Sequence, residues 1–211
     1  MNRTKALLPY ARVLTEWHRE VTQREKLRRG KMLGEGAQLR RAPSLGAVAF
    51  LPGYHALLQR LEASGLEASE LDRERLALLA TLLARVKRNT RPATPADAET
   101  PAAPAKAASS RKLGPTLPQR LGAKAKGSER PLMSEMRFRK LLECETPEEL
   151  RLPMIRAIDL LGGELDVLEL ATDAFGWSQA VRKRWAYDYY DAAARTEAGP
   201  ADALETKGDA A

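Results

Sequence analysis

Apolar residues recur at intervals of three and four along most of this chain, the spacing that places side chains on one face of an α-helix. Three such stripes stand out in the first ninety residues. They run through Tyr10, Val13, Leu14, Trp17 and Val21, through Tyr54, Leu57, Leu58 and Leu61, and through Leu71, Leu78, Leu79, Leu82, Leu83 and Val86. The pattern predicts three amphipathic helices, with a short helix from about Gln38 before the second.

Local signals predict where these helices begin and end. Pro9 and Pro52 suit the first turn of the first and second helix, because a first-turn N–H would have no partner inside the helix. Gly65 predicts the end of the second helix. The third helix is expected to run into Lys87 and Arg88, since cations in a last turn favour the negative end of the helix dipole.

Helical signals resume in the second half of the chain. Thr146, Pro147 and Glu149 combine an N-cap, a first-turn proline and an acid in the first turn, and they mark the best-defined helix start in the sequence. Its apolar stripe contains Pro153, which predicts a kink, and ends at glycines. Further helix starts are expected at Ser134, Asp166 and Ser178.

No segment alternates apolar and polar residues as a strand would, so the predicted fold class is all-α. Residues 92–110 consist largely of Ala, Pro, Thr and Ser and carry no large apolar side chain, which predicts a flexible linker. The expected organisation is therefore two small helical bundles, at residues 1–91 and 111–194, followed by a disordered acidic tail at residues 195–211.

Composition limits the function further. The chain has 211 residues, is 44% hydrophobic and holds one cysteine, so no internal disulfide framework is expected. No apolar run approaches the roughly 20 residues of a membrane span, and no signal-peptide core follows Met1. We therefore expect a soluble, cytoplasmic protein without a membrane partner.

No catalytic or metal-binding constellation stands out. His18, His55 and Cys144 lack the spacing of a zinc site, and Cys144 has no recognisable histidine partner. An acidic cluster of Glu143, Glu145, Glu148 and Glu149 would suit a metal-dependent nuclease, but these acids lie where a helix start favours negative charge. We expect no enzymatic activity, no metal and no cofactor, with a nuclease as a remaining rival.

The net charge of +7 is concentrated in one region. Residues 106–140 carry ten Lys and Arg against two acids, whereas residues 141–211 carry seven against fifteen. Such a surplus attracts polyanions, of which nucleic acid is the commonest. Further basic sites occur at residues 24–31, 40–41, 87–88 and 182–184. Cations with few neighbouring acids suggest recognition of phosphate backbones without base reading.

The order of segments resembles a known family, CasB, the small subunit of the type I-E CRISPR surveillance complex. A basic stretch at residues 38–41 precedes a Pro and Tyr segment at 51–61 and a Leu-rich helix with basic residues at its end. The segment 117–121 resembles the family's basic motif, with Arg120 at its arginine, and residues 134–142 and 177–190 resemble two of its helices. The resemblance spans roughly residues 17–190.

The resemblance implies an all-helical, non-catalytic subunit that stabilises the R-loop in a CRISPR interference complex. Its implied partners are guide RNA, target and displaced DNA strands, the backbone and large subunits, and a second copy of itself. The implied nucleic-acid contacts are Arg40, Arg41, Lys87, Arg88, Arg111, Lys112, Arg120, Arg137, Arg139 and Lys140. The alternative is a helical adaptor that binds only protein partners.

Overall fold

The computed structural model describes residues 3–27, 34–91, 114–125 and 127–197. Within them the fold is helical, which confirms the predicted all-α class. The helices are α1 (Arg3–Leu27), α2 (Glu35–Arg41), α3 (Leu45–Val48), α4 (Pro52–Ala63), α5 (Glu70–Leu83), α6 (Leu117–Gly122), α7 (Glu135–Glu143), α8 (Pro147–Leu160), α9 (Val167–Phe175) and α10 (Gln179–Glu197). Two short strands, β1 (Arg88–Asn89) and β2 (Glu164–Leu165), pair in parallel.

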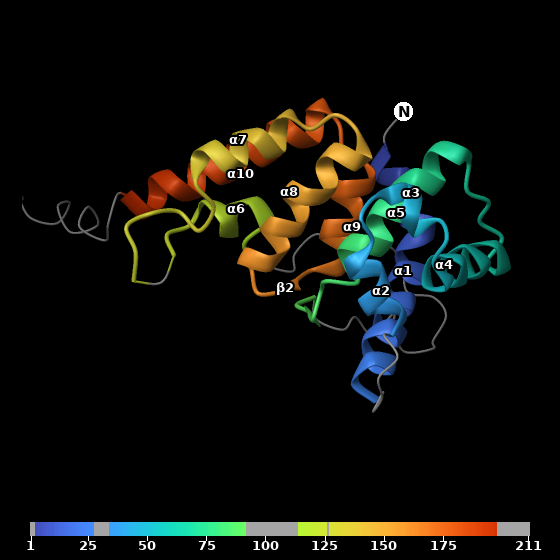
Figure 1. The fold of residues 1–211 in the computed structure, drawn as a ribbon. Coiled ribbons are helices and arrows are strands. Elements are labelled where there is room, and N and C mark those ends of the chain that lie inside the picture. Colours follow the sequence, from blue (N-terminus) through green and yellow to red (C-terminus); the bar gives the residue numbers. More distant parts are fainter. Residues whose placement is uncertain (1–2, 28–33, 92–113, 126, 198–211) are drawn as a thin grey trace, which may run out of the picture.

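The helices pack around one hydrophobic core. Helix α5 packs against α8 and α9, and α1 packs against α4 and α9, so helices from both halves of the sequence meet in the interior. The C-terminal half of α5 is buried on all sides, from Leu76 to Leu83. Figure 1 shows α7 and α10 side by side along the top of the molecule, and α1 and α4 at the opposite side.

The described residues of the two predicted bundles are therefore in direct contact. The proposed linker at residues 92–110 lies outside the described residues, as does most of the predicted tail. The division into two bundles stays a prediction.

Several predicted helix boundaries are confirmed. Helix α4 begins at Pro52 and is followed by Gly65, which has a φ of 71°, a conformation that suits glycine. The Thr146 hydroxyl accepts a hydrogen bond from the Glu149 N–H, while the Glu149 carboxylate accepts one from the Thr146 N–H. This reciprocal pair forms the expected capping box of α8. Asp166 caps α9 through the N–H groups of residues 168 and 169.

Two expectations about helix ends were wrong. Pro9 lies inside α1, which begins at Arg3, because a helix can continue through a proline at the cost of one hydrogen bond. Helix α5 ends at Leu83, so Lys87 and Arg88 do not belong to its last turn. Instead Arg88 forms part of β1, where pairing with β2 satisfies the backbone.

The predicted apolar stripes are buried except for Leu58, which is half-buried, and Leu71. Trp17, Leu57, Trp185 and Tyr189 are almost completely buried, as their helical spacing indicates. Leu71 was expected to face inward, but it is 55% exposed. It lies in the first turn of α5, where it lines an open pocket together with Leu150 of α8 and Phe175 of α9.

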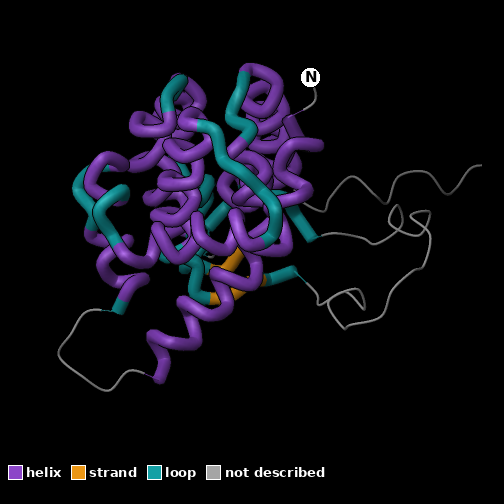
Figure 2. Tube along the Cα trace, turned by 90° about the vertical axis from the view of Figure 1, so that its right-hand side faces the viewer, coloured by secondary structure: helices purple, strands orange, loops and turns teal. Residues whose placement is uncertain are grey.

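The strands β1 and β2 connect the two halves of the chain. Arg88 pairs with Glu164 and Asn89 with Leu165. Figure 2 shows the two strands side by side, with helices around them. A sequence reading could not find them, because two residues are too few to display a strand periodicity.

Candidate nucleic-acid interface

The predicted cations that the structure describes lie on two separate surfaces. The first, the β1–β2 surface, consists of Arg40, Arg85, Lys87, Arg88, Arg91 and Arg120 around the two strands. The second, the α7 surface, consists of Arg137, Arg139 and Lys140. Figure 1 shows α7 along the top of the molecule and β2 lower down, with α8 between them. Arg41 is exposed at the end of α2, and Arg111 and Lys112 lie outside the described residues.

The backbone just before β2 fixes the backbone of the cations that follow α5. The Gly163 carbonyl accepts hydrogen bonds from the N–H groups of Lys87, at 2.8 Å, and Arg88, at 3.2 Å. Gly163 has a φ of 76°, a left-handed conformation that other residues rarely adopt. The side chains of Lys87 and Arg88 are exposed beside this tight connection.

Arg120 reaches the same strand from α6. Its Nη1 donates to the Glu164 carbonyl oxygen at 2.6 Å, and its side chain is half-buried. The short helix α6 is held at its start by a capping box between Thr116 and Gln119. The Arg120 guanidinium therefore has a structural partner in addition to its predicted role as a phosphate contact.

Arg40 and Arg85 complete the cluster from α2 and the end of α5. Arg40 Nη1 donates to the Ala84 carbonyl at 2.9 Å, and Arg85 Nη2 donates to the Arg40 carbonyl at 2.9 Å. The Arg40 side chain thus binds the backbone next to Arg85, and the Arg85 side chain binds the backbone of Arg40. These bonds fix α2 against the end of α5 beside β1.

Three acids lie among the six cations of the β1–β2 surface. Glu164 pairs with Arg88. Asp159 lies 3.3 Å from Arg85, and Asp166 lies 3.6 Å from Arg91. Lys87 and Arg88 remain exposed on this surface, and exposed cations attract polyanions.

A half-buried carboxyl of α9 holds the start of α6. Glu169 Oε1 accepts a hydrogen bond from the Leu117 N–H at 2.8 Å, at the first residue of α6. Burial raises the pKa of Glu169 to about 7, and the nearby acids Asp173 and Asp166 add to this shift. The position of the helix that carries Arg120 therefore depends on a carboxyl that titrates near neutral pH.

The α7 surface is built differently. Arg137 and Lys140 are exposed, and among the described residues no side-chain partner holds either of them. Arg139 donates to Glu135 at 2.6 Å and to the Tyr190 hydroxyl at 3.3 Å. The hydroxyl of Tyr190 and the Glu135 carboxylate both raise the pKa of Arg139. This surface therefore presents cations on one helix with little fixation by the backbone.

The basic residues of α10 mostly hold neighbouring elements. Arg182 donates to the Leu142 carbonyl at 3.2 Å and lies 3.7 Å from Glu145, which ties α10 to the end of α7. Arg184 pairs with the buried Asp173 of α9. These contacts give both arginines a packing role.

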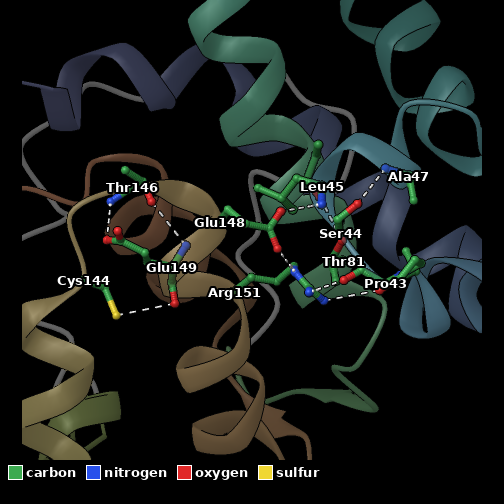
Figure 3. Close-up of polar contacts among 12 residues, drawn as sticks. Pro43, Ser44, Leu45, Ala47, Thr81, Cys144, Thr146, Glu148, Glu149 and Arg151 are labelled. Atoms are coloured by element: carbon green, nitrogen blue, oxygen red, sulfur yellow. Dashed lines mark hydrogen bonds and ion pairs between the residues drawn. The ribbon is translucent and has the colours of Figure 1, made fainter.

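The acidic cluster has structural partners. Glu148 accepts hydrogen bonds from the Leu45 N–H at 2.6 Å and from Arg151 at 2.7 Å, and Figure 3 shows it directed toward both. Arg151 in turn donates to the carbonyls of Ala42 and Pro43. Within the part of the chain that the structure describes, no group of His, Cys, Asp or Glu side chains is arranged to hold a metal ion.

The remaining nucleophile and base candidates are also packed. Cys144 is buried, and burial raises the pKa of its thiol, which disfavours the reactive thiolate. His18 is buried with its Nε2 2.9 Å from the Val86 carbonyl oxygen. Both side chains are therefore packed inside the fold.

Sequence reasoning missed Arg85, Arg91 and Glu164 as members of the β1–β2 surface. Arg85 and Arg91 belong to the same short segment as Lys87 and Arg88, so clustering in sequence was a usable signal. Glu164 lies 76 residues from Arg88 and becomes its neighbour only through the strand pairing. A single sequence carries no local signal for that contact.

Among the described residues, no helix is long and apolar enough to cross a membrane. The model of the family described as CRISPR-associated protein Cse2 matches residues 35–190. Neither the curated proteins nor the solved structures include a match. The matched residues contain α2 to α9 and most of α10, and thus both surfaces.

Proposed function

The chain belongs to the CRISPR-associated Cse2 family, the small subunit of type I-E Cascade, also called CasB, and from this premise we propose that it stabilises the R-loop by binding nucleic-acid backbones. The family is a structural component of a complex with other subunits. In our proposal the chain contacts guide RNA and the target and displaced DNA strands. A second copy and the backbone and large subunits are the proposed protein partners.

The observation that carries this proposal is that cations from separate segments gather around the paired strands β1 and β2. Arg40 and Arg85, Lys87 and Arg88, and Arg120 come from three separate segments, and backbone hydrogen bonds hold these segments together. The guanidinium groups of Arg40, Arg85 and Arg120 are held in place, so they lose little conformational freedom on binding phosphate, which favours affinity. The α7 surface adds a second set of exposed cations.

The proposed mechanism is electrostatic. Phosphate neutralisation releases counterions and needs no base contact. In RNA-guided recognition, base pairing supplies the sequence specificity and the exchange of strands is nearly balanced in energy. Backbone contacts from a structural subunit can therefore tip the exchange toward the R-loop.

The test uses Cascade assembled with wild-type subunit or with the Lys87→Gln/Arg88→Gln variant. We expect the variant to assemble normally, to form R-loops with lower affinity, and to flatten the salt dependence of binding by up to about 1.4 to 1.8 in slope, since each lost phosphate contact removes about 0.7 to 0.9. The matched control, Arg73→Gln/Arg156→Gln, removes two exposed cations of α5 and α8.

Equal R-loop affinity and slope for wild type and the Lys87/Arg88 variant would remove the β1–β2 surface from the interface. If the Lys87/Arg88 variant fails to join the complex while the isolated chain shows no retention of single-stranded DNA at low salt, the adaptor alternative is favoured.

A further inference from the structure

Glu164 stands out among the acids of the β1–β2 surface, since it pairs with Arg88, a cation whose side chain is largely exposed. We propose that Glu164 limits the affinity of this surface for nucleic acid by competing with phosphate for Arg88. This inference rests on the proposed function and concerns how the same site is regulated. In this role Glu164 occupies Arg88 within the protein and needs no contact with the nucleic acid.

The strand pairing imposes the contact between the two side chains. Arg88 and Glu164 are paired residues of β1 and β2, and their side chains form an ion pair. The Gly163 carbonyl holds the backbone of Arg88, while Arg120 holds the Glu164 carbonyl. Glu164 is therefore kept beside Arg88 by backbone bonds, and it does not depend on the ion pair for its position.

Exposure makes this pair replaceable. The side chain of Arg88 is 67% exposed and that of Glu164 is 47% exposed, so solvent screens their attraction. A phosphate oxygen accepts the same hydrogen bonds from a guanidinium as a carboxylate does. An incoming phosphate can thus displace Glu164 from Arg88 at small cost.

The other two acids of the surface are not placed to act in this way. Asp166 is 10% exposed and also caps α9, so it cannot leave Arg91 without disturbing a helix start. Asp159 faces Arg85, which is only 23% exposed and whose other nitrogen holds the Arg40 carbonyl. Arg88, in contrast, has Glu164 as its one side-chain partner among the described residues.

As a consequence, a polyanion that contacts Arg88 alone binds this surface weakly. A polyanion must displace Glu164 before it gains Arg88, and the displaced carboxylate still repels phosphate. A strand that reaches several cations together overcomes this competition more easily than one that touches Arg88 alone. Glu164 would therefore restrain non-specific retention of nucleic acid.

The experiment measures binding of single-stranded DNA and of an RNA–DNA heteroduplex by the full-length chain, as a function of salt. Glu164→Gln is expected to bind nucleic acid about two- to fivefold tighter at moderate salt, because the Glu164 carboxylate no longer competes with phosphate for Arg88. Its salt dependence should steepen by up to about 0.7 to 0.9 in slope. In an Arg88→Gln background, Glu164→Gln should no longer change the affinity, as a double-mutant cycle requires.

The matched control is Glu16→Gln. Glu16 is 44% exposed and pairs with Arg12 on α1, so this variant gives the same change in net charge outside the β1–β2 surface. It should leave affinity within about 1.5-fold of wild type, because a distant exposed charge is screened. Thermal unfolding of each variant verifies that the fold is retained.

Three results would overturn the inference: unchanged or weaker binding by Glu164→Gln, an equal gain from Glu16→Gln, or a gain that persists when Arg88 is replaced. The proposed function fails separately. In that case the wild-type chain does not bind nucleic acid at low salt, and Arg88→Gln in the assembled complex leaves R-loop formation unchanged.

Discussion

The β1–β2 surface and the α7 surface carry similar charges on different supports. On the first, Arg40, Arg85 and Arg120 each donate to a backbone carbonyl of another segment. On the second, Arg137 and Lys140 extend into solvent from one helix. Substituting the arginines of the first surface should therefore destabilise the fold. Substituting Arg137 or Lys140 should not. Basic residues that look alike in a sequence can therefore differ in how much the stability of the fold depends on them.

The most disruptive test of this difference is Gly163→Ala. A Cβ at Gly163 would lie 2.9 Å from the Arg85 carbonyl oxygen, and its φ of 76° is unfavourable for alanine. We expect a loss of about 3 kcal/mol in the free energy of unfolding, from strain and overpacking together. Chemical denaturation measures this loss.

Gly162→Ala is the matched control, because Gly162 has a φ of 69° but no atom within 4 Å of its Cβ position. It should cost only about 1 kcal/mol. An equal loss of unfolding free energy in both variants would show that the close approach of Gly163 to the Arg85 carbonyl oxygen contributes nothing.

The next test concerns the pH dependence of α6. Burial raises the pKa of Glu169 to about 7 from 4.5, so the folded chain binds this proton more tightly than the unfolded chain. Its stabilising contribution is fully present below about pH 4.5 and is lost as the pH rises through about 7. Between pH 5 and 8.5, wild type should therefore lose up to about 3 kcal/mol of stability relative to Glu169→Gln.

Comparing wild type with Glu169→Gln also removes the effect of His18 on the pH dependence. Burial lowers the pKa of His18, so its contribution has the opposite sign and is lost as the pH falls. Both chains contain His18, and the difference between their denaturation curves isolates Glu169. Parallel pH profiles for the two chains would contradict the prediction.

A smaller effect is expected from Arg120→Ala. This change leaves the Glu164 carbonyl without its 2.6 Å donor and should reduce the free energy of unfolding by about 1 to 3 kcal/mol. Nucleic-acid affinity should fall with it, because β2 loses a support. Arg137→Ala, the control from the α7 surface, should stay within about 0.5 kcal/mol of wild type. Weaker binding by Arg120→Ala with unchanged stability would mean that Arg120 acts only as a phosphate contact.

The smallest effect on stability is expected from Arg137→Gln/Lys140→Gln. Both side chains are exposed, so the free energy of unfolding should change by less than about 0.5 kcal/mol. The salt dependence of R-loop binding should nevertheless flatten, by up to about 1.4 to 1.8 in slope if each cation contacts a phosphate. An unchanged slope in titrations of the assembled complex would limit the interface to the β1–β2 surface.

The sequence predicted the helices well, because their signals are local. Pro52, Thr146 and Asp166 mark starts that the structure has at the same residues. The stripe around Trp17 is buried as expected. Capping and periodicity act within one helix and need no knowledge of the rest of the chain.

The candidate site was harder to predict, because it depends on contacts between distant segments. The cations at 40, 87, 88 and 120 were named individually, but their meeting at β2 follows from strand pairing and tertiary hydrogen bonds. The same reason explains why Glu164 escaped notice. Charge composition identifies the kind of partner, whereas the carbonyl groups that hold each arginine become evident only in three dimensions.

The pairing of β1 with β2 also has a consequence for the order of folding. Residues 88 and 164 are 76 positions apart, and closing so long a loop carries an entropic cost that only native packing offsets. During synthesis β1 leaves the ribosome well before β2 exists. We therefore expect the assembled basic surface to be absent from the nascent chain, and the capacity to hold nucleic acid to arise only at the end of folding.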